Sequence, residues 1–179
     1  MEFVIGTPEQ QVRVQQVISG AMDGEQVSVL GAVHALRDMG GITFLTLRMA
    51  DGLLQCVCQP ETEPEGLCEE CTVRVSGRVR GEQRAPGGRE LVVEGIEILS
   101  RSAQAMPVPV SECKLDLNLD TELSLRPVVL RAQRERAVFR IQAGLCRAFR
   151  EYLTGQGFTE IHTPKIVHAG AEGGSNIFR

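Results

Sequence analysis

Two side chains on one predicted strand, Phe44 and Arg48, have the types and the spacing that binding of a nucleic-acid base requires. Alternation along residues 42–49 places both on one face of the strand, while Leu45 and Leu47 fall on the opposite, apolar face. An aromatic ring offers a flat surface for stacking, and a guanidinium can bind a phosphate or a base. The same pattern also fits a ring that another part of the chain covers, so the residues alone leave both interpretations open.

The next predicted strand, residues 53–59, places a glutamine on the same sheet surface. Alternation directs Leu54, Cys56 and Cys58 inward. The residues directed outward are Gln55, Val57 and Gln59. The amide of Gln55 can both donate a hydrogen bond to a base edge and accept one from it. Most exposed glutamines contact only water, so Gln55 indicates base binding only in combination with the aromatic ring.

A later run, residues 72–80, carries arginines that alternate with valines. Arg74, Arg78 and Arg80 fall outward together with Ser76. Val73, Val75 and Val79 fall inward. Three arginines on one strand face form either a local basic patch or an ordinary solvated surface, and the pattern does not separate the two.

Overall charge limits what kind of nucleic-acid site the chain can carry. The 179 residues include 19 basic and 23 acidic residues, a formal net charge of −4. Residues 1–105 hold nine arginines against 15 acidic residues, whereas residues 106–179 hold ten basic against eight acidic residues. A generic basic binding surface is therefore excluded, and any site in the first part must be local.

Hydropathy indicates a cytoplasmic protein without a membrane partner. No apolar run approaches the roughly 20 residues that span a bilayer. Residues 1–6 also lack the basic start and the apolar stretch of a secretory signal. We therefore expect the six cysteines to be reduced thiols and not a disulfide framework.

Four of those cysteines lie close together, as Cys56-Val-Cys58 and Cys68-Glu-Glu-Cys71. A closed tetrahedral zinc site usually takes two CxxC-type pairs. Here the first pair alternates inward on an apolar strand, so we expect buried thiols and no zinc. The chain also lacks a phosphate-binding glycine loop, an HExxH motif and a nucleophile motif beside its three histidines. No complete catalytic signature is present in these 179 residues.

Five short strand-like runs would position these side chains. They cover residues 27–37, 42–49, 53–59, 72–80 and 90–99, with turn signals between them. Such spacing predicts a small closed β-barrel, for which the five-stranded OB-fold is our prediction and an SH3-like barrel is the alternative. Before the barrel, Thr7-Pro8 predicts the start of a short helix.

The second half of the chain changes to helical patterning. After a proline-containing stretch, apolar residues at steps of three and four predict a long helix over 131–154, which Gly155 ends. We therefore predict a barrel domain with a short N-terminal helix over residues 1–105 and a linker or hinge over 106–130. The start of a second, incomplete domain is predicted over 131–179.

In this order, the motifs resemble those of the aspartyl-tRNA synthetases of the archaeal and eukaryotic type, a class IIb family. The first half of the resemblance rests on Gly31-Ala-Val-His-Ala-Leu-Arg37, Gly40-Gly-Ile-Thr-Phe-Leu-Thr-Leu-Arg48, Asp51-Gly-Leu-Leu-Gln55 and Arg84-Ala-Pro-Gly-Gly88. These are similar to parts of the family's anticodon-binding OB domain. The second half rests on Gly157-Phe-Thr-Glu-Ile-His-Thr-Pro-Lys-Ile166, which resembles motif 1 of class II synthetases, and on Glu172-Gly-Gly-Ser175, which resembles the start of a substrate loop. One departure is Ala32, where the family usually has an aromatic residue.

The resemblance implies that Phe44 stacks on the central anticodon base and that Gln55 reads the edge of that base. It also implies anticodon contacts for Arg37, Arg48, His34, Glu90 and Pro86. His34 and Pro86 lie where members that discriminate between two tRNAs and members that do not tend to differ, and we expect the relaxed type. The expected partners are therefore tRNA-Asp and, for the relaxed type, tRNA-Asn.

For the second domain, the resemblance implies a homodimer through motif 1, with Pro164 and Phe158 at its interface. It implies an aspartate site that includes Glu172 and Ser175. ATP and Mg²⁺ would serve the whole enzyme at sites outside this chain, because the arginines of motifs 2 and 3 that hold ATP are absent from it. No catalytic residue is therefore assigned, and we expect the 179 residues alone to be inactive.

Two other functions fit the same residues. One is an asparaginyl-tRNA synthetase, because that family shares both domains and the residues that choose the amino acid lie beyond Arg179. The other is a non-catalytic OB module that binds single-stranded nucleic acid. Against the module stands the amphipathic helix over 131–154, whose apolar stripe needs a partner.

Overall fold

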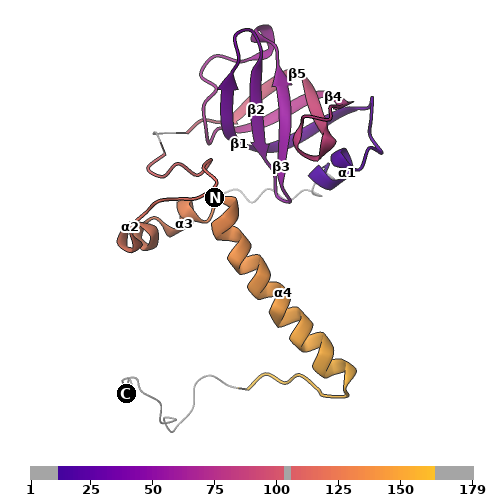
Figure 1. Cartoon of the computed structure of the whole chain (residues 1–179), viewed down its shortest axis with the longest axis vertical. Helices are drawn as coiled ribbons and strands as arrows, with labels where there is room; N and C mark the ends of the chain where they lie inside the picture. The colour runs from indigo at the N-terminus through magenta and orange to yellow at the C-terminus, as the bar shows by residue number, and fades with distance from the viewer. Residues whose placement is uncertain (1–11, 103–105, 164–179) are drawn as a thin grey trace, which may run out of the picture. The chain divides into compact units, whose positions relative to one another are not determined.

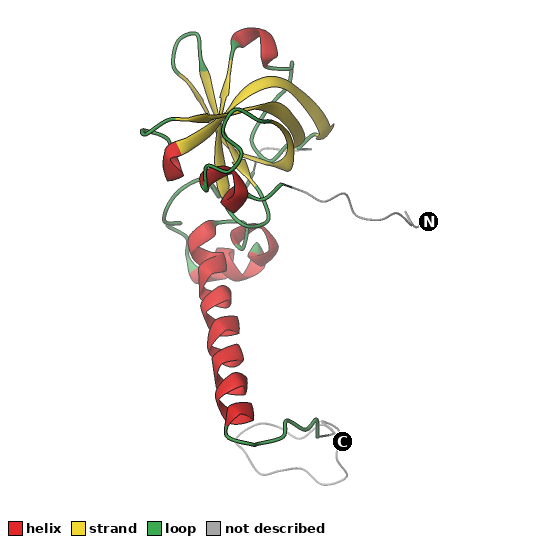
Figure 2. Cartoon of the chain, turned by 90° about the vertical axis from the view of Figure 1, so that its right-hand side faces the viewer, coloured by secondary structure: helices red, strands yellow, loops and turns green. Residues whose placement is uncertain are grey.

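The computed structural model describes residues 12–102 and 106–163 as a β-barrel followed by helices (Figures 1 and 2). The chain divides into two compact units, Met1–Ala132 and Gln133–Arg179. The first unit contains the barrel and a small helical segment, and the second is built on one long helix. Within the described residues, none of the helices has the length and apolar character needed to cross a membrane.

Five strands form the barrel: β1 (Gln26–Asp38), β2 (Thr43–Arg48), β3 (Leu53–Cys58), β4 (Thr72–Gly81) and β5 (Arg89–Ser100). Their order around the closed barrel is β1-β2-β3-β5-β4, and β1 also pairs with β4. All neighbouring strands are antiparallel except β3 and β5, which are parallel. This closed five-stranded barrel confirms the OB-fold prediction over the SH3-like alternative, and each strand lies within two residues of the run predicted for it.

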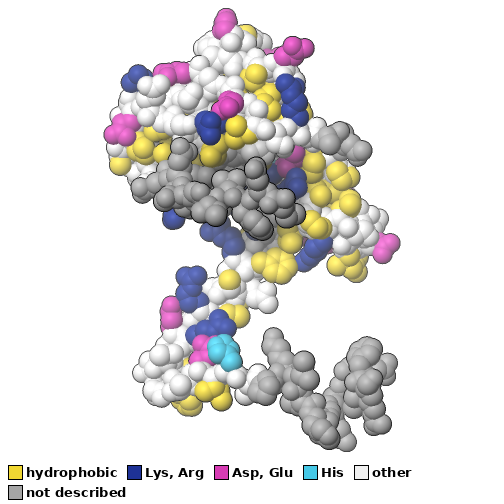
Figure 3. All heavy atoms as spheres, turned by 180° about the vertical axis from the view of Figure 1, so that it is seen from behind, with side chains coloured by type: hydrophobic (Ala, Val, Ile, Leu, Met, Phe, Trp, Pro, Cys, Tyr) yellow, Lys and Arg dark blue, Asp and Glu magenta, His cyan; other side chains and the backbone are white. Residues whose placement is uncertain are grey.

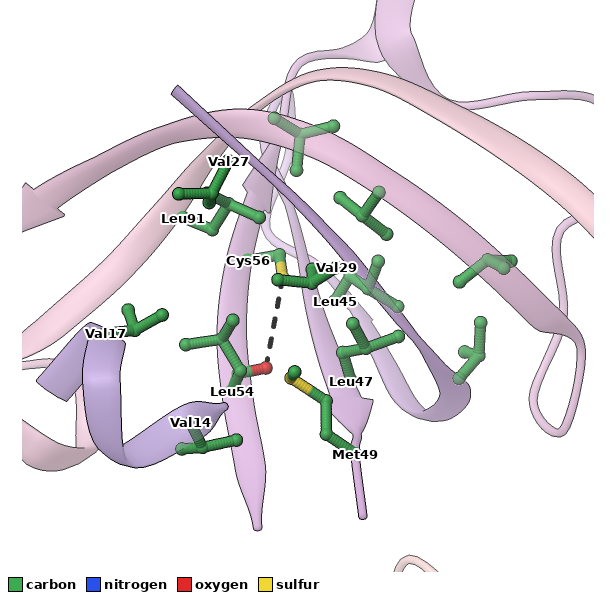
Figure 4. Close-up of a cluster of buried hydrophobic side chains, with 14 of the residues drawn as sticks. Val14, Val17, Val27, Val29, Leu45, Leu47, Met49, Leu54, Cys56 and Leu91 are labelled. Carbon is green, nitrogen blue, oxygen red and sulfur yellow. Dashed lines mark hydrogen bonds between the residues drawn. The ribbon is translucent and has the colours of Figure 1, made fainter. Parts of the chain in front are cut away.

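Alternate residues of all five strands fill the barrel interior (Figure 4). Fully buried members include Leu45, Leu47, Leu54, Cys56, Val73, Val75, Val79 and Leu91. The inward registers predicted for β2, β3 and β4 are therefore confirmed. Val57 lies on the outer face as predicted but is only 7% exposed, where it pairs with Phe44 on β2 and Val92 on β5.

A short helix, α1 (Val14–Ile18), packs its buried valines into the barrel core (Figure 4). The Asp51 carboxylate accepts hydrogen bonds from the backbone N–H groups of Val14 (3.2 Å) and Gln15 (3.4 Å). This contact satisfies donors that a helix start leaves unpaired. The helix start predicted at Thr7-Pro8 lies outside the described residues.

Two positions in the barrel require glycine, one for its positive φ and one for a close approach of two strands. Gly41 has a φ of 113° in the β1–β2 hairpin, which the hydrogen bond from Met39 N–H to the Ile42 carbonyl closes at 3.0 Å. On β4, a Cβ at Gly77 would lie 2.2 Å from the backbone oxygen of Val92, at a register shift between β4 and β5. A side chain at position 77 would therefore push these strands apart. Two 3₁₀ turns, Pro60–Thr62 and Pro86–Gly88, lie in the β3–β4 and β4–β5 connections.

The segment after the barrel contains two short helices, α2 (Leu119–Ser124) and α3 (Arg126–Val129). The Asn118 side-chain oxygen accepts a hydrogen bond from Thr121 N–H at 2.8 Å and caps α2. Val108, Val110 and Val129 form a separate small core here. Sequence patterning did not predict these helices, because four to six residues are too few to show a helical period.

The second unit begins with α4 (Gln133–Gly155), which confirms the long helix predicted from the apolar period. The chain leaves the helix through Gly157 at a φ of 86°. Residues on α4 with large exposed apolar side chains are Val138, Phe139, Ile141, Leu145, Phe149 and Tyr152, and no residue of the helix is buried. Most of its apolar stripe is therefore exposed.

Candidate nucleic-acid interface

The aromatic ring singled out by the sequence lies on the outer face of the barrel. Phe44 is half-buried, and the residues paired with it across the sheet are Arg37 on β1 and Val57 on β3. The buried side chains of α1, Val14 and Val17, belong to the interior core, of which Phe44 is not a member. Part of the ring surface is thus accessible, as stacking on a base requires.

A cation stands beside this ring, and it is Arg37. Its side chain is exposed, and within residues 12–102 and 106–163 its guanidinium has no ion-pair partner. An arginine in this position can bind a phosphate without first breaking an internal contact. The structure therefore brings together Arg37 and Phe44, two residues for which the resemblance implied anticodon contacts.

Next to the ring, a buried carboxylate orients the glutamine of β3. Glu90 on β5 is 2% exposed and accepts a hydrogen bond of 2.9 Å from Gln55 Nε2. Its second oxygen accepts a hydrogen bond from the Arg80 guanidinium, which also forms an ion pair with it. Gln55 keeps its amide oxygen and one N–H for a ligand, because the described residues make no other hydrogen bond to that side chain. We call Arg37, Phe44, Gln55 and Glu90 the Phe44 face.

Arg48, two residues beyond Thr46 on the same strand face, has a different environment. Its guanidinium donates two hydrogen bonds of 2.7 Å to the two carboxylate oxygens of Glu70. Arg131 also donates to Glu70 at 2.7 Å. The side chains of Arg48 and Glu70 are only 9% and 4% exposed. Burial favours the neutral form of the Glu70 carboxyl, but its bonds to both arginines outweigh burial and hold its pKa below the ordinary value.

His34 completes this group, which we call the Glu70 cluster: His34, Arg48, Glu70 and Arg131. The pairing of β1 with β2 shifts register between Val33 and Ala35, so His34 lies at a bulge. Its ring is 6% exposed, and its Nδ1 lies 3.3 Å from Arg48 Nη1. Burial and the charge of Arg48 lower the pKa of His34.

The Glu70 cluster contains two residues for which RNA contacts were predicted, and those contacts stay predictions. Arg48 was expected to contact RNA; in the structure it donates two hydrogen bonds to Glu70, and its side chain is 9% exposed. His34 was expected near the anticodon; in the structure it is 6% exposed and lies against Arg48. Sequence reasoning also missed Glu70 and Arg131, whose roles depend on residues 22 and 61 positions away in the chain. No local pattern marks such a contact.

The three arginines of β4 are exposed, as predicted, but each faces a glutamate of β5. Arg74 pairs with Glu97 at 2.7 Å, and Arg78 lies 3.9 Å from Glu94. Arg80 pairs with Glu90. In Figure 3, basic and acidic side chains lie beside one another on the barrel face shown. The row is therefore a charge-paired surface and not the local basic patch that the arginines alone suggested.

The remaining predicted residues lie in the β4–β5 connection, in the second unit or outside the described residues. Pro86 is exposed in the 3₁₀ turn between β4 and β5, and Phe158 is 64% exposed after α4. Pro164, Glu172 and Ser175 lie outside the described residues.

The cysteines of β3 belong to the barrel core and not to a cluster of metal ligands. Cys56 and Cys58 are buried, and burial raises the pKa of the Cys58 thiol to about 11. In the described part of the chain, no three His, Cys, Asp or Glu residues come together in a group that could hold a metal ion.

Two protein families match consecutive parts of the chain. Residues 27–99, which contain the Phe44 face, match the OB-fold nucleic acid binding domain of the tRNA anticodon type. Residues 118–179 match the class II tRNA synthetases (D, K and N). The first match covers the barrel, and the second covers α2, α3, α4 and the residues after them.

Curated relatives extend these matches over most of the chain. An aspartate–tRNA(Asp/Asn) ligase of Deinococcus radiodurans is 46% identical over 156 residues, which are 87% of this chain and 35% of that ligase. The aspartate–tRNA(Asp/Asn) ligase of Thermus thermophilus is 43% identical over 155 residues, 87% of this chain and 36% of that ligase. The chain thus spans little more than a third of the length of these relatives.

A solved structure supports the same assignment. Asparaginyl-tRNA synthetase from Pyrococcus horikoshii, complexed with asparaginyl-adenylate, superimposes with a TM-score of 0.81 at 28% identity. The match covers 93% of this chain and 39% of that chain. By sequence and by fold, the chain is therefore similar to these ligases over most of its length, with an OB-fold nucleic acid binding region followed by a region that matches the class II tRNA synthetases.

Proposed function

We propose that the barrel binds the anticodons of tRNA-Asp and tRNA-Asn, as part of an enzyme that attaches aspartate to tRNA. The observation that carries this proposal is the Phe44 face, where a half-exposed ring lies opposite an exposed arginine that has no ion-pair partner among the described residues, and an oriented amide lies on the next strand. Relatives named for both tRNAs support the choice of ligand.

The geometry suits a uridine at the centre of the anticodon. Both GUC, which reads an aspartate codon, and GUU, which reads an asparagine codon, carry uridine there. Phe44 would stack on this base, and the Gln55 amide offers one acceptor for its N3–H and one donor for a carbonyl oxygen. Glu90 fixes the orientation of the amide, so little side-chain entropy is lost on binding.

Fluorescence anisotropy with labelled anticodon stem-loops tests this proposal. We expect the 179-residue chain to bind GUC and GUU loops more tightly than an unrelated triplet. Phe44→Ala should lose ~1–3 kcal/mol of binding free energy, the usual value of stacking on one base. Phe149→Ala is the matched control, because it removes an exposed aromatic ring from α4. Equal binding of all three loops, unchanged by Phe44→Ala, would leave the barrel as a general single-strand binder or without a role in RNA binding.

For the whole enzyme, we propose ATP and Mg²⁺ as cofactors and aspartate as the amino acid, held mainly by parts of the relatives that this chain does not span. The support is the share of the relatives' length that is matched. The chain alone should therefore show no aspartate-dependent exchange of pyrophosphate into ATP. Exchange above the background without aspartate would contradict this expectation.

We also propose that two copies associate through the second unit, around Phe158 and Pro164. Supporting this, the apolar residues of α4 and Phe158 are exposed, and Leu145, Phe149, Leu153 and Phe158 line a common cavity. Sedimentation equilibrium should show a monomer–dimer equilibrium that Phe158→Asp weakens. A strictly monomeric chain at all concentrations would contradict the proposal.

An asparaginyl-tRNA synthetase is the second candidate, because the superimposed Pyrococcus horikoshii enzyme is of that kind. The barrel does not separate the two, since both anticodons share their central base. Pyrophosphate exchange by the full-length enzyme, with aspartate and asparagine compared, distinguishes them. Exchange that depends on asparagine alone would favour this second candidate.

A further inference from the structure

Two cysteines outside the Phe44 face lie at opposite ends of one tight turn before β4. The Sγ atoms of Cys68 and Cys71 are 3.3 Å apart. The turn is closed by a hydrogen bond of 3.2 Å from Cys71 N–H to the Cys68 carbonyl. Glu70, inside the turn, has a φ of 65°. A four-residue turn brings its end Cα atoms within about 7 Å, a separation that a disulfide can bridge.

The two thiols differ in exposure in the way that a two-step oxidation needs. Cys68 is exposed, so a small oxidant in solution can reach its sulfur. Cys71 is buried at 0% exposure, directly beneath it. Among the described residues, the remaining cysteines do not form a second pair of this kind: Cys56 and Cys58 are buried in the barrel core, and Cys113 and Cys146 are exposed in other parts of the chain.

Charge and hydrogen bonding around the turn favour a thiolate at Cys71. Burial opposes ionisation of that thiol, but hydrogen bonds from the backbone of Ser102 and from Cys68, with the charge of Arg101, lower its pKa. The hydrogen bond shared with Cys71 raises the pKa of Cys68. The two sulfur atoms share one hydrogen bond, and Cys71 is the member of the pair whose pKa is lowered.

We propose that Cys68 and Cys71 are a reversible redox site that hydroperoxides convert into a disulfide within the turn. In the first step, the Cys71 thiolate accepts the Cys68 proton as the Cys68 sulfur attacks a peroxide oxygen; an S–O bond forms, the O–O bond breaks, and the departing hydroxide takes that proton from Cys71 and leaves as water. In the second step, the Cys71 thiolate attacks the Cys68 sulfur, the S–S bond forms and the S–O bond breaks, and the departing hydroxide takes a proton from solvent and leaves as water. Two thiols are oxidised, and one hydrogen peroxide is reduced to two waters.

The disulfide would close a ring around Glu70, whose carboxylate binds Arg48 and Arg131. It would therefore restrain the turn that presents this carboxylate to both arginines. The proposal does not depend on RNA binding, because no residue of the Phe44 face takes part.

Peptide mapping of the reduced 179-residue chain after treatment with hydrogen peroxide tests the proposal. Remaining thiols are alkylated, and the chain is cleaved with a glutamate-specific protease. Cleavage after Glu69 and Glu70 separates the two cysteines, so a disulfide joins two peptides that are otherwise distinct. We expect this linked pair, the loss of two alkylatable thiols, and the return of both after treatment with dithiothreitol.

Three variants test the two oxidation steps separately and control for other cysteines. In Cys71→Ser the second step is blocked, so a dione reagent specific for sulfenic acid should label Cys68, which it does not label in the unaltered chain. In Cys68→Ser, which changes an exposed side chain, Cys71 should remain a free thiol. Cys113→Ser, the matched exposed control, should form the linked pair normally. Free thiols at both positions after peroxide treatment, or a sulfenic acid at Cys68 that persists in the unaltered chain, would overturn the proposal.

Discussion

The outer surface of the barrel carries two arginine-containing groups, and they differ in what their polar atoms bind. In the Phe44 face, Arg37 is exposed and unpaired among the described residues, beside a half-exposed ring. In the Glu70 cluster, the Arg48 side chain is 9% exposed and both of its terminal nitrogens donate to one carboxylate. An arginine can bind an external ligand only through N–H groups that the protein itself does not already bind.

The two groups therefore contribute to different properties. Breaking a buried ion pair leaves an uncompensated charge and lowers the free energy of unfolding. Removing a side chain that faces solvent changes little in the free protein and appears only when the ligand binds. The following predictions separate these two effects.

The largest effect is expected from Glu70→Gln. Loss of this charge leaves Arg48 buried without its counterion, and removal of one partner of a buried pair costs about 3–5 kcal/mol of unfolding free energy. Glu97→Gln is the control, because its pair with Arg74 is exposed and worth about 0–1 kcal/mol. Urea denaturation measures both variants. Equal stabilities for the two would show that the Glu70 cluster contributes no more than a surface pair.

A smaller effect, on base preference, is expected from Gln55→Leu. We expect the preference for a central uridine over a central cytidine to fall by about 0.5–1.5 kcal/mol, the value of a neutral hydrogen bond. Anisotropy with the two stem-loops measures the difference between their binding free energies. A variant that weakens both by the same amount leaves this difference unchanged. Gln59→Leu, at the exposed residue directly after the same strand, is the control. An unchanged preference in Gln55→Leu would remove this residue from the interface.

Arg37→Ala should weaken binding of every stem-loop by a similar, modest factor. Loss of one phosphate contact lowers the slope of log affinity against log salt by about 0.7. Arg74→Ala, which removes an arginine already paired with Glu97, should leave that slope unchanged. Titrations at several salt concentrations test both variants. If Arg74→Ala lowers the salt slope more than Arg37→Ala does, the presence or absence of an internal ion pair does not decide which arginine contacts RNA.

The smallest effect concerns pH. Burial and Arg48 lower the pKa of His34 in the folded chain, so the unfolded chain takes up a proton first as the pH falls. Stability is therefore greatest above the ordinary histidine pKa and declines as the pH falls from there towards the lowered value. His34→Asn should flatten this decline, whereas His162→Asn, at an exposed histidine, should not. Parallel stability curves for His34→Asn and the unaltered chain would contradict this account.

Much of the barrel could be predicted from the sequence because its signals are local. Two-residue alternation fixes which side of a strand is buried, and this succeeded for Leu45, Leu54 and Val75. Alternation gives no sign of the bulge at His34, nor of the burial of Val57 on the outer face by its neighbours on two strands. The short helices α2 and α3 were missed because they are too short to show a helical period, and the small core that holds α3 is assembled across the segment.

The sequence by itself determined the five strands, the long helix and the placement of Phe44 and Gln55 on one face, since these follow from residue type and period along a continuous stretch. Tertiary structure alone decided which charges remain available. Arg37, Arg48 and Arg74 look alike in the sequence, and only the folded barrel pairs Arg48 with Glu70 and Arg74 with Glu97. The physical reason is that an ion pair depends on distance in space, which the barrel sets between residues more than 20 positions apart.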